Sequence, residues 1–259
     1  MDLEAQDDEW WTSFHVAEMA DVLLSRSDEQ LATTLEFLER ELKLSAGDHV
    51  FDQCCGSGDL AIPLANRGIR VTGCDLFEPY IERARRATAQ RSLDIEPRFF
   101  CADAFDFVPD EPVDAVINWY SSFGYAAADD VNQQMLDRAF EALKPAGLLA
   151  LEVPNIAGLL RGFKDVLVQH GMSSDGPVTL ERTCIPDFAA GLLRQRWEWQ
   201  VEGREPKVRH SALKMYMPNR VCELLREAGF VDLELFGSDE GEPFEMDSPR
   251  LLVTATKPA

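Results

Sequence analysis

Apolar and polar positions form two kinds of pattern along the chain. Short, nearly continuous apolar runs lie between residues 46 and 153, and amphipathic stretches separate them. Such runs are typical of strands buried on both faces of a parallel sheet, whereas an apolar stripe that recurs every three or four residues is typical of a helix. Their alternation predicts a doubly wound α/β domain with right-handed crossovers. The expected strands are 49–54, 70–75, 97–103, 114–120 and 147–153, and the expected helices are 59–68, 77–91 and 131–145.

Other patterns flank this core, which we expect to span residues 46–153. Residues 1–45 contain two amphipathic helical stretches, and we expect them to form an N-terminal helical lid. Residues 154–217 begin with an expected helix near 156–170 and continue with two or three segments of alternating polarity. These segments predict a small antiparallel β insertion over one end of the sheet, on the substrate side. Residues 218–259 are expected to complete the core with a helix at 219–230 and strands at 231–237 and 250–257.

The charge of the chain narrows its possible partners. It has 46 acidic and 25 basic side chains and a formal net charge of −21. Proteins bind nucleic acids and anionic membranes through clusters of Lys and Arg. We therefore expect a small-molecule partner, with no nucleic acid and no membrane, and a monomer or homodimer.

We do not find the sequence motifs of a signal peptide, a membrane-spanning helix or a cysteine zinc site. The first residues lack the basic and apolar regions of a signal peptide, and no stretch approaches the ~18 apolar residues of a membrane-spanning helix. The six cysteines show no C-x-x-C spacing of the kind that binds zinc. These observations predict a cytoplasmic protein with free thiols and no bound metal.

The most informative segment turns from an expected strand into a helix through Gly56 and Gly58. Glycine lets the backbone approach a ligand closely, and the start of the helix presents free N–H groups. Ligands of open α/β sheets bind at this carboxyl edge. We therefore expect the ligand site beside these glycines, although glycines in this place can also serve only to form the turn.

Acids stand at the ends of the next two expected strands. Asp75 lies seventeen residues after Gly58, and Asp103 lies twenty-eight residues after Asp75. A carboxylate at the first place can accept hydrogen bonds from both ribose hydroxyls, and one at the second place can accept from the exocyclic amine of adenine. Asp75 could instead cap the next helix. The repetition at successive strand ends, beginning with Asp52, favours a nucleoside site.

The glycine spacing decides between two classes of nucleoside ligand. A dinucleotide fingerprint has a third glycine three residues after the second, where this chain has Ala61. Asp52 and Asp59 would repel a pyrophosphate, but they suit a cationic sulfonium. An NAD-dependent oxidoreductase therefore remains an alternative that the spacing disfavours.

These residues resemble the glycine motif of the class I S-adenosylmethionine (SAM)-dependent methyltransferase family, in which an acid precedes three glycines at alternate positions. Asp52, Gly56 and Gly58 match, and Cys54 stands where the family has its first glycine. The resemblance covers about residues 46–153 and 219–257. It implies a Rossmann-like seven-stranded sheet of order 3-2-1-4-5-7-6, with strand 7 antiparallel. It also implies SAM as cofactor and S-adenosyl-L-homocysteine (SAH) as product.

The same resemblance implies cofactor contacts residue by residue. Asp75, with Leu76 beside it, would bind the ribose, Asp103 and Ala104 would bind the adenine, and Asn118 and Trp119 would meet the methionine part. The implied cofactor set is Asp52, Cys54, Gly56, Gly58, Asp75, Leu76, Asp103, Ala104, Asn118 and Trp119.

Two further features resemble one branch of that family, the small-molecule methyltransferases with an N-terminal helical lid, some of which serve bacterial natural-product pathways. They are the Ser121–Tyr125 run and the paired tryptophans near the start. On this basis we expect six aromatic side chains to bind the substrate, although ordinary core packing is the alternative for each. They are Trp10, Trp11, Phe14, Tyr125, Trp197 and Tyr216.

Charged and titratable side chains supply the remaining candidates. Arg182, Arg196 and Lys214 could meet a substrate anion or be solvated. A general base is needed only if the acceptor must lose a proton at neutral pH. The candidate catalytic bases are His15, His210 and Tyr120.

We therefore expect a SAM-dependent methyltransferase that acts on N or O of a small molecule, such as a natural-product intermediate. The segment Asn118–Ser121 lacks the two prolines found in family members that methylate the amino groups of DNA bases or of protein glutamine. Three alternatives stay open: an NAD-dependent oxidoreductase, a non-catalytic SAM-binding protein, and a protein or tRNA methyltransferase. Cys54 keeps the second of these open.

Overall fold

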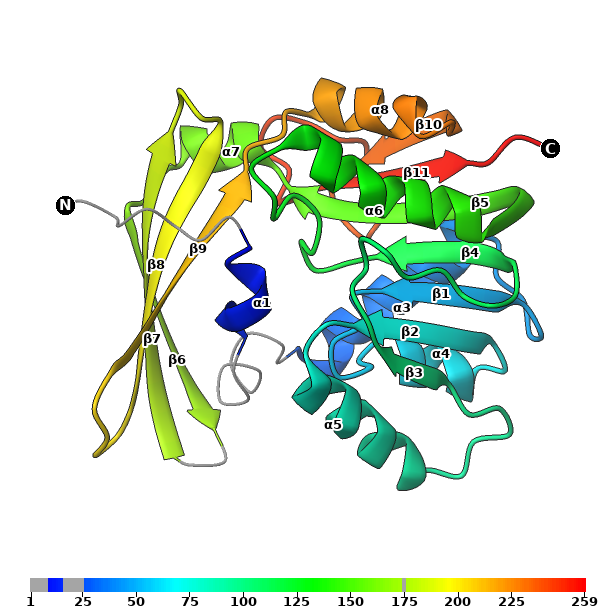
Figure 1. Ribbon diagram of the computed structural model, residues 1–259, viewed down its shortest axis with the longest axis horizontal. Helices are drawn as coiled ribbons and strands as arrows, with labels where there is room; N and C mark the ends of the chain where they lie inside the picture. Colours follow the sequence, from blue (N-terminus) through cyan, green and yellow to red (C-terminus); the bar gives the residue numbers. More distant parts are fainter. Residues whose placement is uncertain (1–8, 16–25, 174–175) are drawn as a thin grey trace.

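The computed structural model describes residues 9–15, 26–173 and 176–259, which form two sheets (Figure 1). The larger sheet has the order β10-β11-β5-β4-β1-β2-β3, and β11 runs antiparallel to β5. This order confirms the doubly wound fold expected from the sequence. The strands are β1 (His49–Gln53), β2 (Arg70–Asp75), β3 (Arg98–Cys101), β4 (Val113–Asn118), β5 (Leu143–Pro154), β10 (Val231–Phe236) and β11 (Arg250–Thr256).

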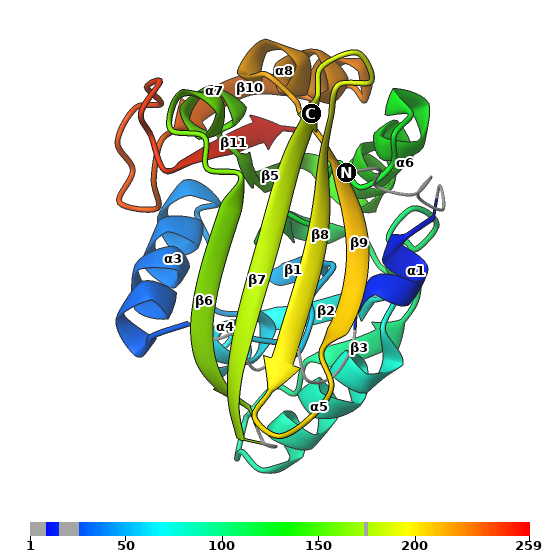
Figure 2. The same cartoon turned by 90° about the vertical axis from the view of Figure 1, so that its left-hand side faces the viewer.

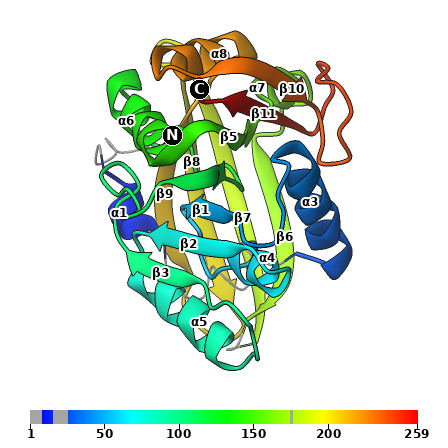
Figure 3. The same cartoon turned by 90° about the vertical axis from the view of Figure 1, so that its right-hand side faces the viewer.

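Helices cover both faces of this sheet, as Figure 3 shows with α3 and α6 on opposite sides. One buried cluster joins the sheet to α6 and α8, and a second joins it to α3, α4 and α5. Neighbouring residues of one strand divide between the two: Phe51 belongs to the first cluster and Val50 to the second. The helices are α1 (Trp11–Phe14), α3 (Asp28–Glu41), α4 (Ala61–Asn66), α5 (Glu78–Ala89), α6 (Asp129–Ala142), α7 (Ile156–Arg161) and α8 (Pro218–Glu227).

The expected N-terminal lid of residues 1–45 is divided in the structure. Residues 1–8 and 16–25 lie outside the described residues. Helix α3 packs its apolar stripe, including Phe37 and Leu38, against the sheet, because these side chains are buried in the same cluster as β1 and β2. It is therefore part of the core. Within the described part of residues 1–45, α1 lies at the carboxyl edge, between the two sheets (Figure 1).

The second sheet consists of β6 (Val166–Ser173), β7 (Gly176–Asp187), β8 (Leu192–Val201) and β9 (Lys207–Lys214), all antiparallel. It stands across the carboxyl ends of β1, β2 and β4 (Figure 1), and Figure 2 shows its outer face. This arrangement confirms the expected antiparallel insertion over one end of the larger sheet. None of the described helices is long and apolar enough to cross a membrane.

The expected helix at 156–170 is wrong beyond its first turns. Helix α7 ends at Arg161, Gly162 follows as its C-cap, and β6 begins at Val166. The alternation in β6 places Leu167 toward the larger sheet and exposes Val166 and Val168 on the outer face. Gly162 ends the helix, the valines of β6 favour a strand, and each residue of β6 gains a partner in the ladder with β7.

Candidate active site

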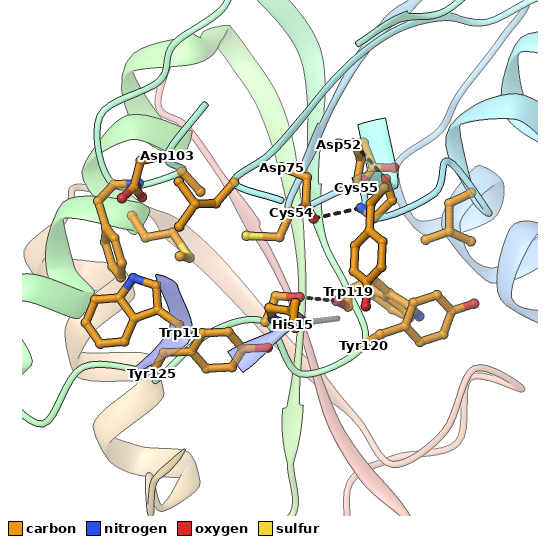
Figure 4. A pocket seen from close by; sticks show the side chains of 18 of the residues that line it. Trp11, His15, Asp52, Cys54, Cys55, Asp75, Asp103, Trp119, Tyr120 and Tyr125 are labelled. Atoms are coloured by element: carbon orange, nitrogen blue, oxygen red, sulfur yellow. Dashed lines mark hydrogen bonds between the residues drawn. The ribbon is translucent and has the colours of Figure 1, made fainter. Parts of the chain in front are cut away.

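A first cavity of about 130 Å³ lies at the carboxyl ends of β1, β2 and β4 (Figure 4). The strand ends and the loops that follow them supply most of its wall, as expected for an open α/β sheet. Eight of the ten residues expected to bind the cofactor line it. They are Asp52, Cys54, Gly56, Asp75, Leu76, Asp103, Ala104 and Trp119.

The turn after β1 needs the left-handed backbone conformation three times. Cys54, Gly56 and Gly58 have φ angles of 65°, 54° and 81°. Glycine adopts these angles at little cost, whereas Cys54 carries a side chain in a conformation that costs about 1–2 kcal/mol. The Cys54 side chain points into the cavity beside Asp75 (Figure 4). The departure from the glycine motif therefore places a thiol on the wall of the cavity.

Asp75 ties this turn to the end of β2. Its Oδ2 accepts a hydrogen bond from the backbone N–H of Gly56, and its Oδ1 accepts one from that of Phe77, each over 2.9 Å. Burial raises the pKa of the Asp75 carboxyl, although these two bonds act in the opposite direction. Asp103 is held in a similar way, since its Oδ1 accepts from the backbone N–H of Phe105 over 3.0 Å. Both carboxylates are thus fixed with lone pairs left for a ligand.

The first cavity is strongly acidic. Asp52, Asp59, Asp75 and Asp103 line it, and no Lys or Arg does among the described residues. Burial, with the charges of Asp75 and Asp59 added to it, raises the pKa of Asp52 to about 8. A cation that entered the cavity would lower this pKa, because the carboxylate form would gain an opposite charge. The wall therefore suits a positively charged ligand.

Gly58 and Asn118 lie behind this wall rather than on it. A Cβ on Gly58 would come within 3.0 Å of the Phe99 ring, so the residue serves close packing of the turn. The Asn118 side chain turns into the core, where its Nδ2 donates to Oε1 of Gln53 over 3.0 Å. Neither residue lines the first cavity, so the expected contact of these two residues with the cofactor stays a prediction.

Gln53, which was not among the expected site residues, lies behind the wall of the cavity and holds two of its lining residues. Its Nε2 donates to the backbone oxygens of Ala104 (3.3 Å) and Met135 (3.0 Å). It thereby links β1 to the loop after β3 and to α6, and it orients Asn118. The signal in the sequence is a large amide at the end of an otherwise apolar strand. A group of this kind is retained in a core only where its hydrogen bonds are satisfied.

A second cavity of about 480 Å³ adjoins the first, between the carboxyl edge and the inner face of the second sheet. Three residues, His15, Tyr120 and Tyr125, line both cavities. Of the six expected substrate residues, Trp11 lines the first cavity, Tyr125 lines both, and Trp10, Phe14 and Trp197 line the second. A ligand in one cavity would therefore share a wall with a ligand in the other.

Tyr216, the sixth expected substrate residue, lies in the core instead. Its ring stacks on Phe123, its hydroxyl donates to Oδ1 of Asp129 over 3.0 Å, and it accepts from Nδ2 of Asn132 over 2.9 Å. The side chain is 4% exposed, and its hydroxyl is satisfied by two residues of α6. Tyr216 therefore connects the end of β9 to α6.

The three candidate bases differ in position and environment. Burial lowers the pKa of His15 to about 4, so its imidazole is neutral where the two cavities meet. Burial raises the pKa of Tyr120 to about 12, and its hydroxyl has no hydrogen-bond partner among the described residues. His210 pairs with Arg196 in the β8–β9 ladder, on the face opposite Ser211, and lines neither cavity. The structure thus places His210 away from the site.

The donor set of the first cavity fits SAM. Asp75 and Asp103 present acceptors for hydroxyl and amine hydrogens, and the four carboxylates suit a sulfonium and an ammonium group. Trp11 lines the cavity, and its buried indole N–H lacks a partner among the described residues. An unpaired buried donor is costly, so it is a place where a ligand acceptor would be stabilising.

Comparison with known proteins identifies the family. Residues 50–147 match the family described as "Methyltransferase domain". The SAM-dependent Diels-Alderase iccD of Talaromyces variabilis is 32% identical over 214 residues, which are 76% of this chain and 71% of that protein. The tRNA 5-carboxymethoxyuridine methyltransferase of Escherichia coli K12 is 30% identical over 191 residues, 67% of this chain and 68% of that protein.

Solved structures agree with this result at the level of the fold. The CcbJ methyltransferase from Streptomyces caelestis has a TM-score of 0.77 at 18% identity, over 98% of this chain and 100% of that one. Together these matches set aside the NAD-dependent oxidoreductase. The chain belongs to the class I SAM-dependent methyltransferase family, and its cofactor is SAM.

Proposed function

We propose that the chain transfers a methyl group to N or O of a small molecule held in the second cavity. The observation that carries the proposal is the common wall of His15, Tyr120 and Tyr125, which both cavities share. Bound SAM supplies an electrophilic methyl group on its sulfonium. Because methyl transfer needs the acceptor in line with that group, two adjoining cavities give the alignment on which the rate depends.

The residues where the two cavities meet also position α1 and offer a base for a proton of the acceptor. Tyr125 is partly buried, and the indole N–H of Trp10 donates to its backbone oxygen over 3.1 Å, which holds α1 against the loop after β4. His15 faces both cavities as a neutral imidazole. An amine acceptor needs no base in its neutral form, whereas a hydroxyl acceptor would give its proton to His15. The side chains therefore serve either kind of acceptor.

We also propose that α1 acts as the lid over bound cofactor. The first cavity, about 130 Å³, is smaller than the roughly 300–1,000 Å³ of typical ligand pockets. Trp11 and His15 form part of its wall. Entry of the cofactor would displace this wall, and its return would then cover the ligand. Amide exchange of residues 11–15 should slow when SAH is added, and unchanged exchange would argue against a lid.

A tRNA acceptor is the second candidate, since one relative that is 30% identical is named a tRNA methyltransferase. The net charge of −21 favours the small molecule, because RNA binding depends on phosphate contacts by basic side chains. We further propose a cytoplasmic protein that works as a monomer or homodimer. The six cysteines are free thiols, in agreement with a reducing compartment.

The test is to follow the methyl group. The protein is incubated with methyl-labelled SAM and, separately, with bulk tRNA, a protein extract and the small-molecule fraction of a bacterial extract. We expect label in the small-molecule fraction, and much less of it with Trp197→Ala, which opens the wall of the second cavity. Arg196→Ala on the outer face is the control. Label confined to tRNA or protein would overturn the proposal.

A further inference from the structure

The two adjoining cavities carry opposite charges. Four aspartates line the first cavity, and no Lys or Arg does among the described residues. Arg26, Lys164 and Arg182 line the second, and no Asp or Glu among the described residues does. This reversal occurs in a chain with nearly twice as many acidic as basic side chains. The second cavity is therefore a local basic site on an acidic protein.

The second sheet contributes Arg182 to this reversal by sorting its charges between its faces. Strand alternation turns Arg182 and Trp197 toward the cavity, and these two residues are direct cross-strand partners. The acids of the same strands lie on the other face. Glu181 is paired with Glu198 in the ladder, and Glu198 accepts a hydrogen bond from Arg196 over 2.5 Å. The outer arginine is thus neutralised within the sheet.

Arg182 has no such carboxylate. It makes no ion pair with the described residues, and its guanidinium lies over the Trp197 ring, 4.9 Å from the centroid. Stacking on an aromatic face holds the planar group in place but leaves its N–H donors available in the plane. A guanidinium in this state binds a carboxylate or phosphate through two parallel hydrogen bonds.

The surface on which Arg182 rests is itself fixed. The indole N–H of Trp197 donates to Oγ of Ser211 over 2.8 Å, and that hydroxyl donates to Oε1 of Gln195 over 2.9 Å. The Trp197 ring also contacts the Phe14 ring edge to face, with 5.6 Å between centroids. These side chains are buried, so Arg182 is held ready for a partner before any ligand arrives.

We infer that the methyl acceptor is an anionic small molecule whose carboxylate or phosphate binds Arg182. The inference rests on the proposed function and deepens it. Arg182 is not among the residues shared by the two cavities, so the anionic group is an anchor and the methylated atom lies toward His15. The cationic cofactor and the anionic acceptor would each enter a cavity of opposite charge, and this electrostatic attraction would guide each ligand to its own cavity.

The test uses three probes that differ mainly in charge: 4-hydroxyphenylacetate, 4-hydroxybenzylphosphonate and the neutral 4-hydroxyphenylacetamide. Each is titrated calorimetrically into the full chain saturated with SAH. We expect at least one anion to bind tenfold or more tightly than the amide. The anion that binds more tightly distinguishes a carboxylate acceptor from a phosphate acceptor. Arg182→Gln should remove the preference, and Arg182→Lys should keep part of it.

Arg196→Gln is the matched control, because it makes the same change one strand away on the outer face, and it should keep the wild-type preference. An amide that binds as tightly as both anions, a preference that survives in Arg182→Gln, or binding of none of the probes would each overturn the inference. If one of these results is found while methyl label still enters the small-molecule fraction, the proposed function stands and only the anionic acceptor is excluded. Label confined to tRNA or protein instead contradicts the proposed function itself.

Discussion

The backbone N–H of Gly56 donates a hydrogen bond to Oδ2 of Asp75 over 2.9 Å. This bond joins the turn after β1 to the end of β2, next to each other in the sheet. Asp75 therefore has two tasks: it holds the glycine turn open, and it presents a carboxylate to the first cavity. The acid and the glycines are a single structural unit, although seventeen residues separate Asp75 from Gly58.

Replacement of Asp75 by Ala should weaken SAH binding by tenfold or more, about 1.4 kcal/mol. The variant loses the acceptor for ligand hydroxyls and also the bond that positions Gly56. Calorimetric titration of SAH measures the effect. Asp106→Ala is the control, since that side chain is exposed three residues beyond Asp103. Equal affinities for wild type and Asp75→Ala would show that the ribose is bound elsewhere.

The site was predictable wherever backbone topology alone determines position. Parallel strands end at one edge, so Asp75 and Asp103 come together whatever the loops do. The direction in which a side chain points was not predictable in this way. Asn118 lies at the same edge, but it points inward to Gln53, and no pattern of residue types distinguishes that orientation. Tyr216 also follows a strand end near the site and packs into the core.

In the fold, too, some elements were predictable from the sequence and others were not. The core strands were predictable because continuous apolar runs have few other uses in a chain of this length. The second sheet was only partly predictable, since the apolar positions of α7 and β6 follow one another closely and only the pairing with β7 shows where the strand begins. The two cavities arise only when that sheet is placed across the carboxyl edge. Their opposite charges therefore depend on contacts between distant segments.

Replacement of Gly58 by Ala should destabilise the fold beyond the cost of its backbone angle. Gly58 and Gly203 have φ angles of 81° and 78°, but a Cβ on Gly203 meets nothing within 4 Å. We expect Gly203→Ala to cost about 1–2 kcal/mol. Gly58→Ala adds the clash with Phe99 and should cost about 1–3 kcal/mol more. Urea unfolding of both variants measures the difference, and equal losses would show that the neighbours of Gly58 relax freely.

Binding of SAM should release protons from Asp52 below pH 8. Burial, together with Asp75 and Asp59, raises the pKa of Asp52 to about 8, so the free protein carries this side chain protonated at neutral pH. A sulfonium in the cavity favours the carboxylate and expels the proton, and affinity for SAM should therefore rise with pH until about 8. Titration at pH 7 in buffers of different ionisation enthalpy counts the protons released. Asp52→Asn should abolish this release, and SAH, without the positive sulfur, should show less of it.

Removal of a base should affect hydroxyl acceptors more than amines. His15 is neutral at the junction of the cavities, whereas the pKa of Tyr120 is raised to about 12 and its hydroxyl is protonated at neutral pH. With a hydroxyl acceptor, His15→Phe should lower kcat by about 100-fold or more, and Tyr120→Phe should leave it within a factor of a few. The comparison is made at saturating SAM. A large loss in Tyr120→Phe alone would reverse the assignment.

Acid should destabilise the protein partly through His15. Burial lowers its pKa from 6.5 to about 4, so the unfolded chain binds a proton in this range that the folded chain excludes. The free energy of unfolding should therefore fall as the pH drops from about 6.5 to about 4, by up to about 3 kcal/mol from this group. His15→Phe keeps an aromatic ring against Phe77 and Tyr80 and removes the titration. Urea unfolding at pH 7.5 and pH 4.5 should show a smaller loss for this variant than for wild type or for His210→Phe, and identical losses in all three would place the acid sensitivity in other groups.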